Sequence, residues 1–423
     1  MSVTQFIENE TSFAQKLFDD VRALSIDGPG VSRQGYGPVE SKVVDYLLEV
    51  GRRLGLETNR DAAGNWWMTM PGKDRSLPAI VAGSHADSVP QGGNYDGLAG
   101  IVAALCVAHW LREQHIELRQ DFTVLILRCE ESSYFGKAYV GSLGMMGRLS
   151  ENDLALQRRD GQQTLGDAMR SCGVMPEQLI TGYPVIDTQR IAAFIELHIE
   201  QGPMLDSRLP ARVGIVTGIR GNIRHKTVVC HGETAHSGAV DKAFRHDAVM
   251  ATASLIHQLE ARWQSFLDDG QDLVFTVGVL NTAPTAAISV IPGEVKFTID
   301  IRSLSEATCE AFHQEVMKLA QVLEQKRGVR FTFDSPLRTL PGHVDSKLSD
   351  RLYRSAERIG IPCVRLPSGA GHDTAVISAA GIPSAMIFVA NQHGSHNPHE
   401  AMKIEDFMAG CSILMATVVE LEK

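Results

Sequence analysis

Three short apolar segments of this chain each run directly into a cluster of ionisable residues, and this pattern restricts the fold more than any other feature. Buried strands are predicted at residues 79–83, 122–127 and 191–197, because these segments have the length and β-branched content of such strands. These segments are followed by Ser84-His85-Ala86-Asp87, by Glu130-Glu131 and by His198. In open α/β sheets, ligands bind beyond the carboxyl ends of the strands. The pattern therefore predicts an α/β fold with a site at that edge of the sheet.

The middle of the chain has a different pattern, in which paired β segments accompany two long helical stretches. Strands are expected at residues 226–231, 272–280, 294–302 and 329–333, and helices at 245–263 and 305–325. This order favours a small α+β sandwich. Because the α/β pattern resumes afterwards, we expect a discontinuous catalytic domain (1–212 and 334–423) and an inserted lid or dimerisation domain (213–333).

Composition excludes several classes of partner. The 423 residues include 40 Lys and Arg against 50 Asp and Glu, a net charge of −10, which argues against a nucleic-acid or anionic-membrane partner. Residues 1–20 do not have the pattern of a secretory signal, and the longest nearly apolar stretch, 97–110, is too short to span a bilayer. Seven cysteines without a CxxC pair are typical of reduced thiols. We expect a cytoplasmic protein.

The residues at the predicted strand ends match the needs of a two-metal hydrolytic site. Asp96 lies in a Gly-rich turn, and His396 and His399 lie near the C-terminus. Two divalent ions about 3.5–4 Å apart need His nitrogens, terminal carboxylates and one bridging carboxylate. Clusters of His, Asp and Glu without Cys indicate zinc or manganese. A glutamate that binds no metal can transfer a proton between water and a leaving nitrogen.

Simpler interpretations of these residues stay open on pattern alone. A histidine at a strand end is more often hydrogen-bonded than metal-bound, and a Glu-Glu pair is more often solvated. A phosphate cradle at Gly92-Gly93 lacks both Gly-rich phosphate motifs, and Ser142 does not form a GxSxG elbow. The coincidence of several clusters at strand ends is what favours the metal site.

An ordered set of motifs, covering the chain from about residue 30 to its end, resembles a known family. The motifs are residues 83–97, 130–133, 196–202, 235–238, 290–293, 300–302, 368–373 and 395–400. The set resembles the hydantoinase/carbamoylase branch of the M20 metallopeptidase-like amidohydrolases. This resemblance implies that the discontinuous catalytic domain is zinc-peptidase-like. That branch includes N-carbamoyl-L-amino-acid hydrolases, β-ureidopropionases and allantoate amidohydrolases.

The resemblance implies a role for each residue of the metal site. His85 and His198 would bind one metal ion, Glu131 and His396 would bind the other, and Asp96 would bridge the two. Glu130 would act as general base and acid. Asp87 would orient His85, since a metal-bound imidazole needs a partner for its other nitrogen.

The resemblance also implies a substrate-binding set, in which this chain departs from the family. His236 would reach a neighbouring active site to stabilise an oxyanion, and Arg302 would bind a substrate carboxylate. Gln201, Gly369 and Ala370 are weaker substrate contacts. Ser289 and Asn222 replace the family's Asn and Gln, Tyr134 replaces an Arg, and 239–242 replaces a Thr-Thr-Pro segment.

The expected function is hydrolysis of the C–N bond of an N-carbamoyl or ureido acid by a homodimer with two divalent ions per subunit. Zinc or manganese is expected, with cobalt or nickel as alternatives. Allantoate hydrolysis and a dipeptidase-like activity are alternatives within the class. A metal-binding relative without activity is the least favoured, because Glu130 and the ligand set are all present.

Overall fold

The computed structural model describes residues 3–207 and 211–421, and the chain divides into two compact units. Unit 1 comprises Met1–Thr217 and His343–Lys423, and unit 2 comprises Gly218–Gly342. The predicted insert, 213–333, differs from unit 2 at both ends. It includes the start of β8 (Val213–Ile219), which pairs with β18 of unit 1, and it leaves out β16 (Leu337–Thr339), which pairs with β9 of unit 2.

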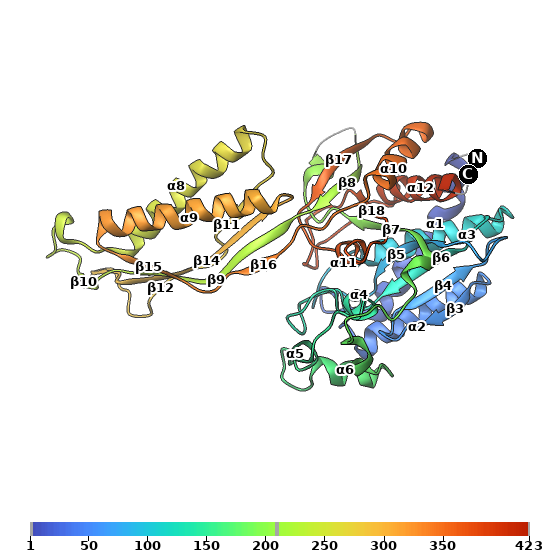
Figure 1. The fold of residues 1–423 in the computed structure, drawn as a ribbon, viewed down its shortest axis with the longest axis horizontal. Coiled ribbons are helices and arrows are strands. Elements are labelled where there is room, and N and C mark those ends of the chain that lie inside the picture. The colour runs from blue at the N-terminus through green and yellow to red at the C-terminus, as the bar shows by residue number, and fades with distance from the viewer. Residues whose placement is uncertain (1–2, 208–210, 422–423) are drawn as a thin grey trace. The chain divides into compact units, whose positions relative to one another are not determined.

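Unit 1 is built on an eight-stranded sheet with a parallel centre (Figure 1). In the order in which they lie side by side, the strands are β17 (Cys363–Ser368), β8, β18 (Ser384–Val389), β7 (Ile191–Ile199), β5 (Ala79–His85), β6 (Phe122–Leu127), β4 (Trp66–Met70) and β3 (Glu57–Arg60). The strands β18, β7, β5 and β6 run parallel, so their carboxyl ends meet at one edge. The predicted α/β class is confirmed.

Helices cover both faces of this sheet because successive residues of a strand point to opposite sides. On β5, Ile80 and Ala82 pack into one core, whereas Val81 packs into the other. The helices of the first core are α1 (Val3–Ser25), α2 (Pro38–Arg53), α3 (Leu98–Glu113), α10 (Ser346–Ile359) and α12 (Ile404–Leu421). The second core includes α4 (Val140–Met145), α6 (Leu165–Ser171) and α11 (Asp373–Ser378). Unit 1 also contains the short helices α5 (Glu151–Leu154) and α7 (Met204–Ser207) and the strand pair β1 (Ile26–Asp27) and β2 (Gly30–Val31).

Unit 2 is an antiparallel sheet with two helices packed on one face (Figure 1). Every second residue of β14 (Glu294–Ser303) is buried against α8 (Ala248–Asp268) and α9 (Glu306–Arg327). Neighbouring strands are β9 (Gly221–His231), β11 (Val274–Thr276), β12 (Leu280–Thr282), β15 (Arg330–Phe333) and β16. A separate pair is formed by β10 (Ala235–His236) and β13 (Val290–Ile291).

One expected strand is wrong in detail. The segment predicted as a continuous strand over 272–280 is divided into β11 and β12. Between them, Val279 donates its backbone N–H to the Thr298 hydroxyl (3.1 Å), and β14 shifts its register between Phe297 and Ile299. A side chain that accepts a backbone N–H interrupts the ladder at that point.

Across the described ranges, no helix combines the length and apolarity that crossing a bilayer requires.

Candidate metal centre

The carboxyl edge of the parallel strands brings five of the predicted side chains together. His85 ends β5, His198 lies near the end of β7, and Glu131 lies just beyond β6. Asp96 precedes α3, and His396 lies in the loop after β18. Since strands β5, β6 and β7 are parallel neighbours, residues separated by up to 311 positions in sequence meet at one edge.

Asp96 lies between two groups of possible ligands. Its Oδ1 is 3.5 Å from His85 Nε2 and 3.2 Å from His198 Nε2, and all three side chains are buried. Its Oδ2 is 3.4 Å from His396 Nε2, which in turn is 3.2 Å from Glu131 Oε1. Each group could hold a cation. One carboxylate therefore presents one oxygen to each group, as a bridging ligand does.

The donor atoms of these groups fit a divalent metal ion. With bond lengths of about 2.1 Å, two ligands of a tetrahedral zinc ion lie roughly 3.4 Å apart, close to the separations above. The Nδ1 of His198 faces the backbone oxygen of Ile199 (2.8 Å), and the Nδ1 of His85 faces that of Asp87 (3.2 Å). Both rings thus direct Nε2 toward Asp96, the arrangement that metal-bound histidines show.

The electrostatics of the cluster favour positive charge. Hydrogen bonds to Asp96 and Glu131 raise the pKa of His396 to about 11. Burial would lower the pKa of His85, but Asp87 and Asp96 outweigh it, and the pKa lies well above its ordinary value. Burial likewise opposes ionisation of Asp96, yet its three histidine partners hold its pKa well below its usual range. A cluster that stabilises protons in this way is suited to a metal cation in their place.

Glu130 belongs to neither group of possible ligands. Its side chain is buried, and its Oε2 lies 3.9 Å from His85 Nε2. Burial, together with the neighbouring Glu131, holds its pKa well above its usual range. A carboxyl group of raised pKa beside a metal site is suited to exchange protons near neutral pH.

Asp87 contacts the backbone of both glutamates. Its Oδ1 accepts the N–H of Glu130 (2.9 Å) and its Oδ2 accepts that of Glu131 (3.0 Å). The same Oδ1 is 3.4 Å from His85 Nδ1. The predicted partner of His85 therefore also binds the segment that carries Glu130 and Glu131.

Sequence reasoning missed further polar groups around Asp96. The Ser395 hydroxyl lies 2.5 Å from Asp96 Oδ2 and 2.6 Å from Glu400 Oε2, within hydrogen-bond distance of both, and Glu400 accepts the backbone N–H of Tyr95. Burial and the charge of Asp96 raise the pKa of Glu400 to about 7. Both residues belong to the motif 395–400, which could have indicated them. Gln201, predicted as a substrate contact, donates to Asp96 Oδ2 (2.7 Å).

The loop that carries Gly369 and Ala370 lies beside His198. Ser368 closes this loop by donating to the Ala370 oxygen (2.7 Å) and contacting His372 Nε2 (3.0 Å). The His372 ring packs edge-on to His198, with 4.5 Å between ring centroids. Burial holds the pKa of His372 well below its usual value. His372 was missed as an individual residue, although its motif was recognised.

The other predicted residues lie in unit 2, in two places. Arg302 on β14 pairs in register with Asn222 on β9, and its guanidinium binds Asp300 (Nη2–Oδ2, 2.8 Å). His236 on β10 pairs with Val290, and the backbone oxygen of Ser289 accepts the backbone N–H of Ser237 (2.9 Å). Asp300 therefore supplies Arg302 with a carboxylate, the same group that the prediction expects a substrate to provide.

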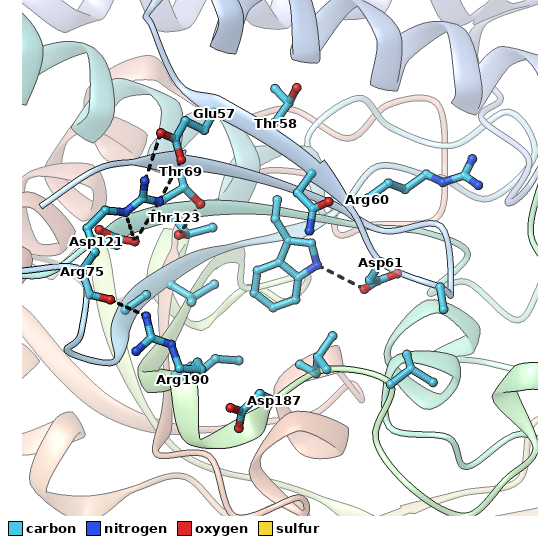
Figure 2. A pocket seen from close by; sticks show the side chains of 18 residues that line it. Glu57, Thr58, Arg60, Asp61, Thr69, Arg75, Asp121, Thr123, Asp187 and Arg190 are labelled. Atoms are coloured by element: carbon cyan, nitrogen blue, oxygen red, sulfur yellow. Dashed lines mark hydrogen bonds and ion pairs between the residues drawn. The ribbon is translucent and has the colours of Figure 1, made fainter.

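A separate pocket of about 670 Å³ lies over the β3, β4 and β6 side of the sheet (Figure 2). Its polar groups bind one another: Arg75 pairs with Glu57 and Asp121, and the Trp67 indole donates to Asp61 (3.2 Å). Arg190 donates to the backbone oxygen of Ser76 (2.7 Å). None of the predicted site residues lines this pocket.

The profile of peptidase family M20/M25/M40 matches residues 81–420, a range that contains every residue of the cluster. The chain belongs to this family. The M20 chain is 34% identical to an allantoate amidohydrolase of Bacillus subtilis (strain 168) over 94% of each protein. It is 33% identical to an N-carbamoyl-L-amino acid amidohydrolase of Geobacillus stearothermophilus over 93% of each.

Solved structures agree with this assignment. The fold of the M20 chain matches an amidase of the hydantoinase/carbamoylase family from Burkholderia multivorans with a TM-score of 0.88, at 27% identity over 97% of each chain. The resemblance predicted from the motifs is confirmed, as is the expectation of a hydrolase.

Proposed function

We propose that this M20 hydrolase cleaves the C–N bond of an N-carbamoyl or ureido amino acid, releasing ammonia, carbon dioxide and the free amino acid. The observation that carries the proposal is the position of Asp96 between two groups of possible ligands, with Glu130 outside both. Relatives with this activity in their names are 30% or more identical over nearly the whole chain. Metal-dependent hydrolysis is the chemistry common to these observations.

Five residues would hold two divalent metal ions in each subunit. His85 and His198 would bind one ion, Glu131 and His396 the other, and Asp96 both. Zinc or manganese suits this nitrogen and oxygen set, with cobalt or nickel as alternatives. Bound ions would lower the pKa of a water molecule and polarise the carbonyl of the substrate.

Glu130 would move the proton. Its carboxylate would accept a proton from the attacking water and deliver it to the departing nitrogen, so that one group serves as base and then as acid. Asp87 would hold this group and His85 in place through the contacts described above. Gln201, Gly369 and Ala370 would bind the substrate beside the metal ligands.

Four residues of unit 2 complete the proposed set. Arg302 would bind the substrate carboxylate in a bidentate manner, with Asn222 beside it on the sheet. His236 would stabilise the oxyanion at a neighbouring active site, which requires a homodimer. Ser289, which is smaller than the family's Asn, would leave room for a substrate of different shape.

Allantoate is the second candidate substrate, because an allantoate amidohydrolase is 34% identical to this chain. A dipeptidase-like activity follows it. A relative without activity is disfavoured, because no predicted ligand is missing and all five meet at one edge of the sheet. All seven cysteines are free thiols, which supports the expected cytoplasmic location.

Ammonia release tests the proposal. Metal-loaded protein is incubated with N-carbamoyl-L-amino acids, N-carbamoyl-β-alanine, allantoate and dipeptides, with Glu130→Gln alongside as the control. Turnover of a carbamoyl amino acid that the variant loses is expected. Turnover of allantoate alone would reassign the substrate, and release of amino acids from dipeptides alone would contradict amidohydrolysis. Undiminished turnover by Glu130→Gln would remove Glu130 from its role.

A further inference from the structure

In the segment 128–131, which carries Glu130 and Glu131, every backbone N–H donates to a side-chain oxygen. Arg128 donates its N–H to Asn65 Oδ1 (3.1 Å), and Cys129 donates to Glu40 Oε1 (3.1 Å). The next two N–H groups bind Asp87, as described above. The carbonyls of residues 128, 129 and 130 accept the N–H groups of residues 141, 140 and 139. The N–H groups of residues 128–131 and the carbonyls of residues 128–130 thus all bind other parts of the protein.

The conformation of Cys129 explains why so many partners are needed. Its φ is 54°, in the left-handed region that a residue with a side chain rarely adopts. This turn directs the following two N–H groups to the single carboxylate of Asp87. A conformation of this kind persists only where its surroundings hold it.

Glu40, in the first turn of α2, is the buried carboxylate that holds Cys129. Its Oε1 accepts the Cys129 N–H, while its Oε2 accepts the Tyr36 N–H (2.7 Å) and the Arg128 Nε–H (2.8 Å). The Arg128 guanidinium also lies over the Tyr36 ring, 4.9 Å from its centroid. One side chain thus joins α2 to the residue immediately before Glu130.

We propose that Glu40 is a positioning residue for Glu130, which it fixes by holding the Cys129 N–H. The inference rests on the proposed role of Glu130. The hydrogen bonds and the ion pair of Glu40 go to Tyr36, Arg128 and Cys129, so its effect on Glu130 passes through the backbone of residues 128–130. A displacement of a catalytic group by about 1 Å lowers the rate by about a hundredfold, without requiring any loss of substrate binding.

Glu40→Gln is the first test. An amide has only one accepting oxygen, so the variant cannot accept the Cys129 N–H on one oxygen and the N–H groups of Tyr36 and Arg128 on the other. We expect kcat to fall roughly 10- to 100-fold, with KM and bound metal unchanged, measured well below the melting temperature. Glu10→Gln is the matched control, because Glu10 is fully buried in unit 1 and pairs with His109 (2.9 Å) away from this turn. Glu10→Gln is expected to retain wild-type kcat.

The double variant Glu40→Met/Arg128→Met separates positioning from simple charge pairing. It removes both charges at similar volume, a replacement that folded proteins often tolerate, but leaves the Cys129 N–H without its acceptor. The proposal predicts that kcat stays low in this variant. Recovery to the wild-type kcat would show that Glu40 serves only as the counter-ion of Arg128 and would overturn the proposal. Loss of metal in Glu40→Gln, or an equal loss of kcat in Glu10→Gln, would do the same.

Failure of the proposed function would look different. If Glu130→Gln keeps full activity, the role of Glu130 fails whatever Glu40 does. If Glu130→Gln is inactive but Glu40→Gln keeps wild-type kcat, only the positioning role of Glu40 fails.

Discussion

At the scale of single residues, position in the fold decides the role of each carboxylate. Asp96 has three imidazoles around it, and Glu130 has burial and a second carboxylate beside it, so the pKa of Asp96 falls while that of Glu130 rises. Both start from nearly the same intrinsic acidity. The proposed metal ligand and the proposed proton-transfer group are thus distinguished by their neighbours rather than by residue type.

Metal binding should release protons from the histidines. The raised pKa values of His85 and of His396, the latter about 11, mean that a metal ion must displace a proton from each ring at neutral pH. We expect the affinity for Zn²⁺ or Mn²⁺ to rise by about tenfold or more per pH unit between pH 6 and 8. Titration calorimetry in buffers of different ionisation enthalpy measures the protons released. His399→Asn, which alters a histidine outside both ligand groups, should show the same dependence; a pH-independent affinity would contradict the expectation.

At the scale of elements, most strands and helices were predictable because hydrophobic periodicity shows which faces are buried. The helices predicted at 245–263 and 305–325 are present as α8 (Ala248–Asp268) and α9 (Glu306–Arg327). Three of the proposed metal ligands, His85, Glu131 and His198, were recognisable because β5, β6 and β7 lead into distinct motifs. The turn at Cys129 was not predictable, since its left-handed backbone depends on Glu40, 89 positions away, and neither residue carries a local signal. The division of the strand at 277–279 depends likewise on a distant hydroxyl, that of Thr298.

A pair of histidines should make unit 2 sensitive to acid. His313 on α9 lies with its Nε2 2.9 Å from the Nε2 of His225 on β9. Burial, and then the charge of His225, lower the pKa of His313 below its ordinary 6.5. Other charges facing the pair are Asp334 after β15, Glu310 on α9 and Arg338 on β16.

Because the folded-state pKa of His313 is lowered, its contribution to stability is complete above about pH 6.5 and is lost as pH falls through the lowered pKa. His313→Gln should therefore lose less stability between pH 7 and 5 than the wild type. Hydrogen exchange of peptides from β9 and α9 measures this, with α12 of unit 1 as the internal reference. Equal slopes for the two proteins would show that His313 does not titrate in this range.

At the scale of the whole molecule, all five proposed metal ligands belong to unit 1. A ligand that binds only the folded state stabilises it, by about 2.7 kcal/mol at a hundred times its dissociation constant. Chelation should therefore lower the melting temperature of unit 1 by roughly 5 °C or more and leave unit 2 unchanged. Hydrogen exchange during a thermal series resolves the two units, and Zn²⁺ added back should restore the wild-type behaviour. An equal effect on both units would argue against a site confined to unit 1.

The two ends of unit 2 are joined to each other. Ile219 and Gly342 exchange two backbone hydrogen bonds of 2.9 Å, so the chain leaves this unit beside the point where it enters. A tight turn could connect these positions. The segment 218–342 is thus inserted between two neighbouring points of the chain, and a short turn in its place would leave the order of strands in the eight-stranded sheet unchanged.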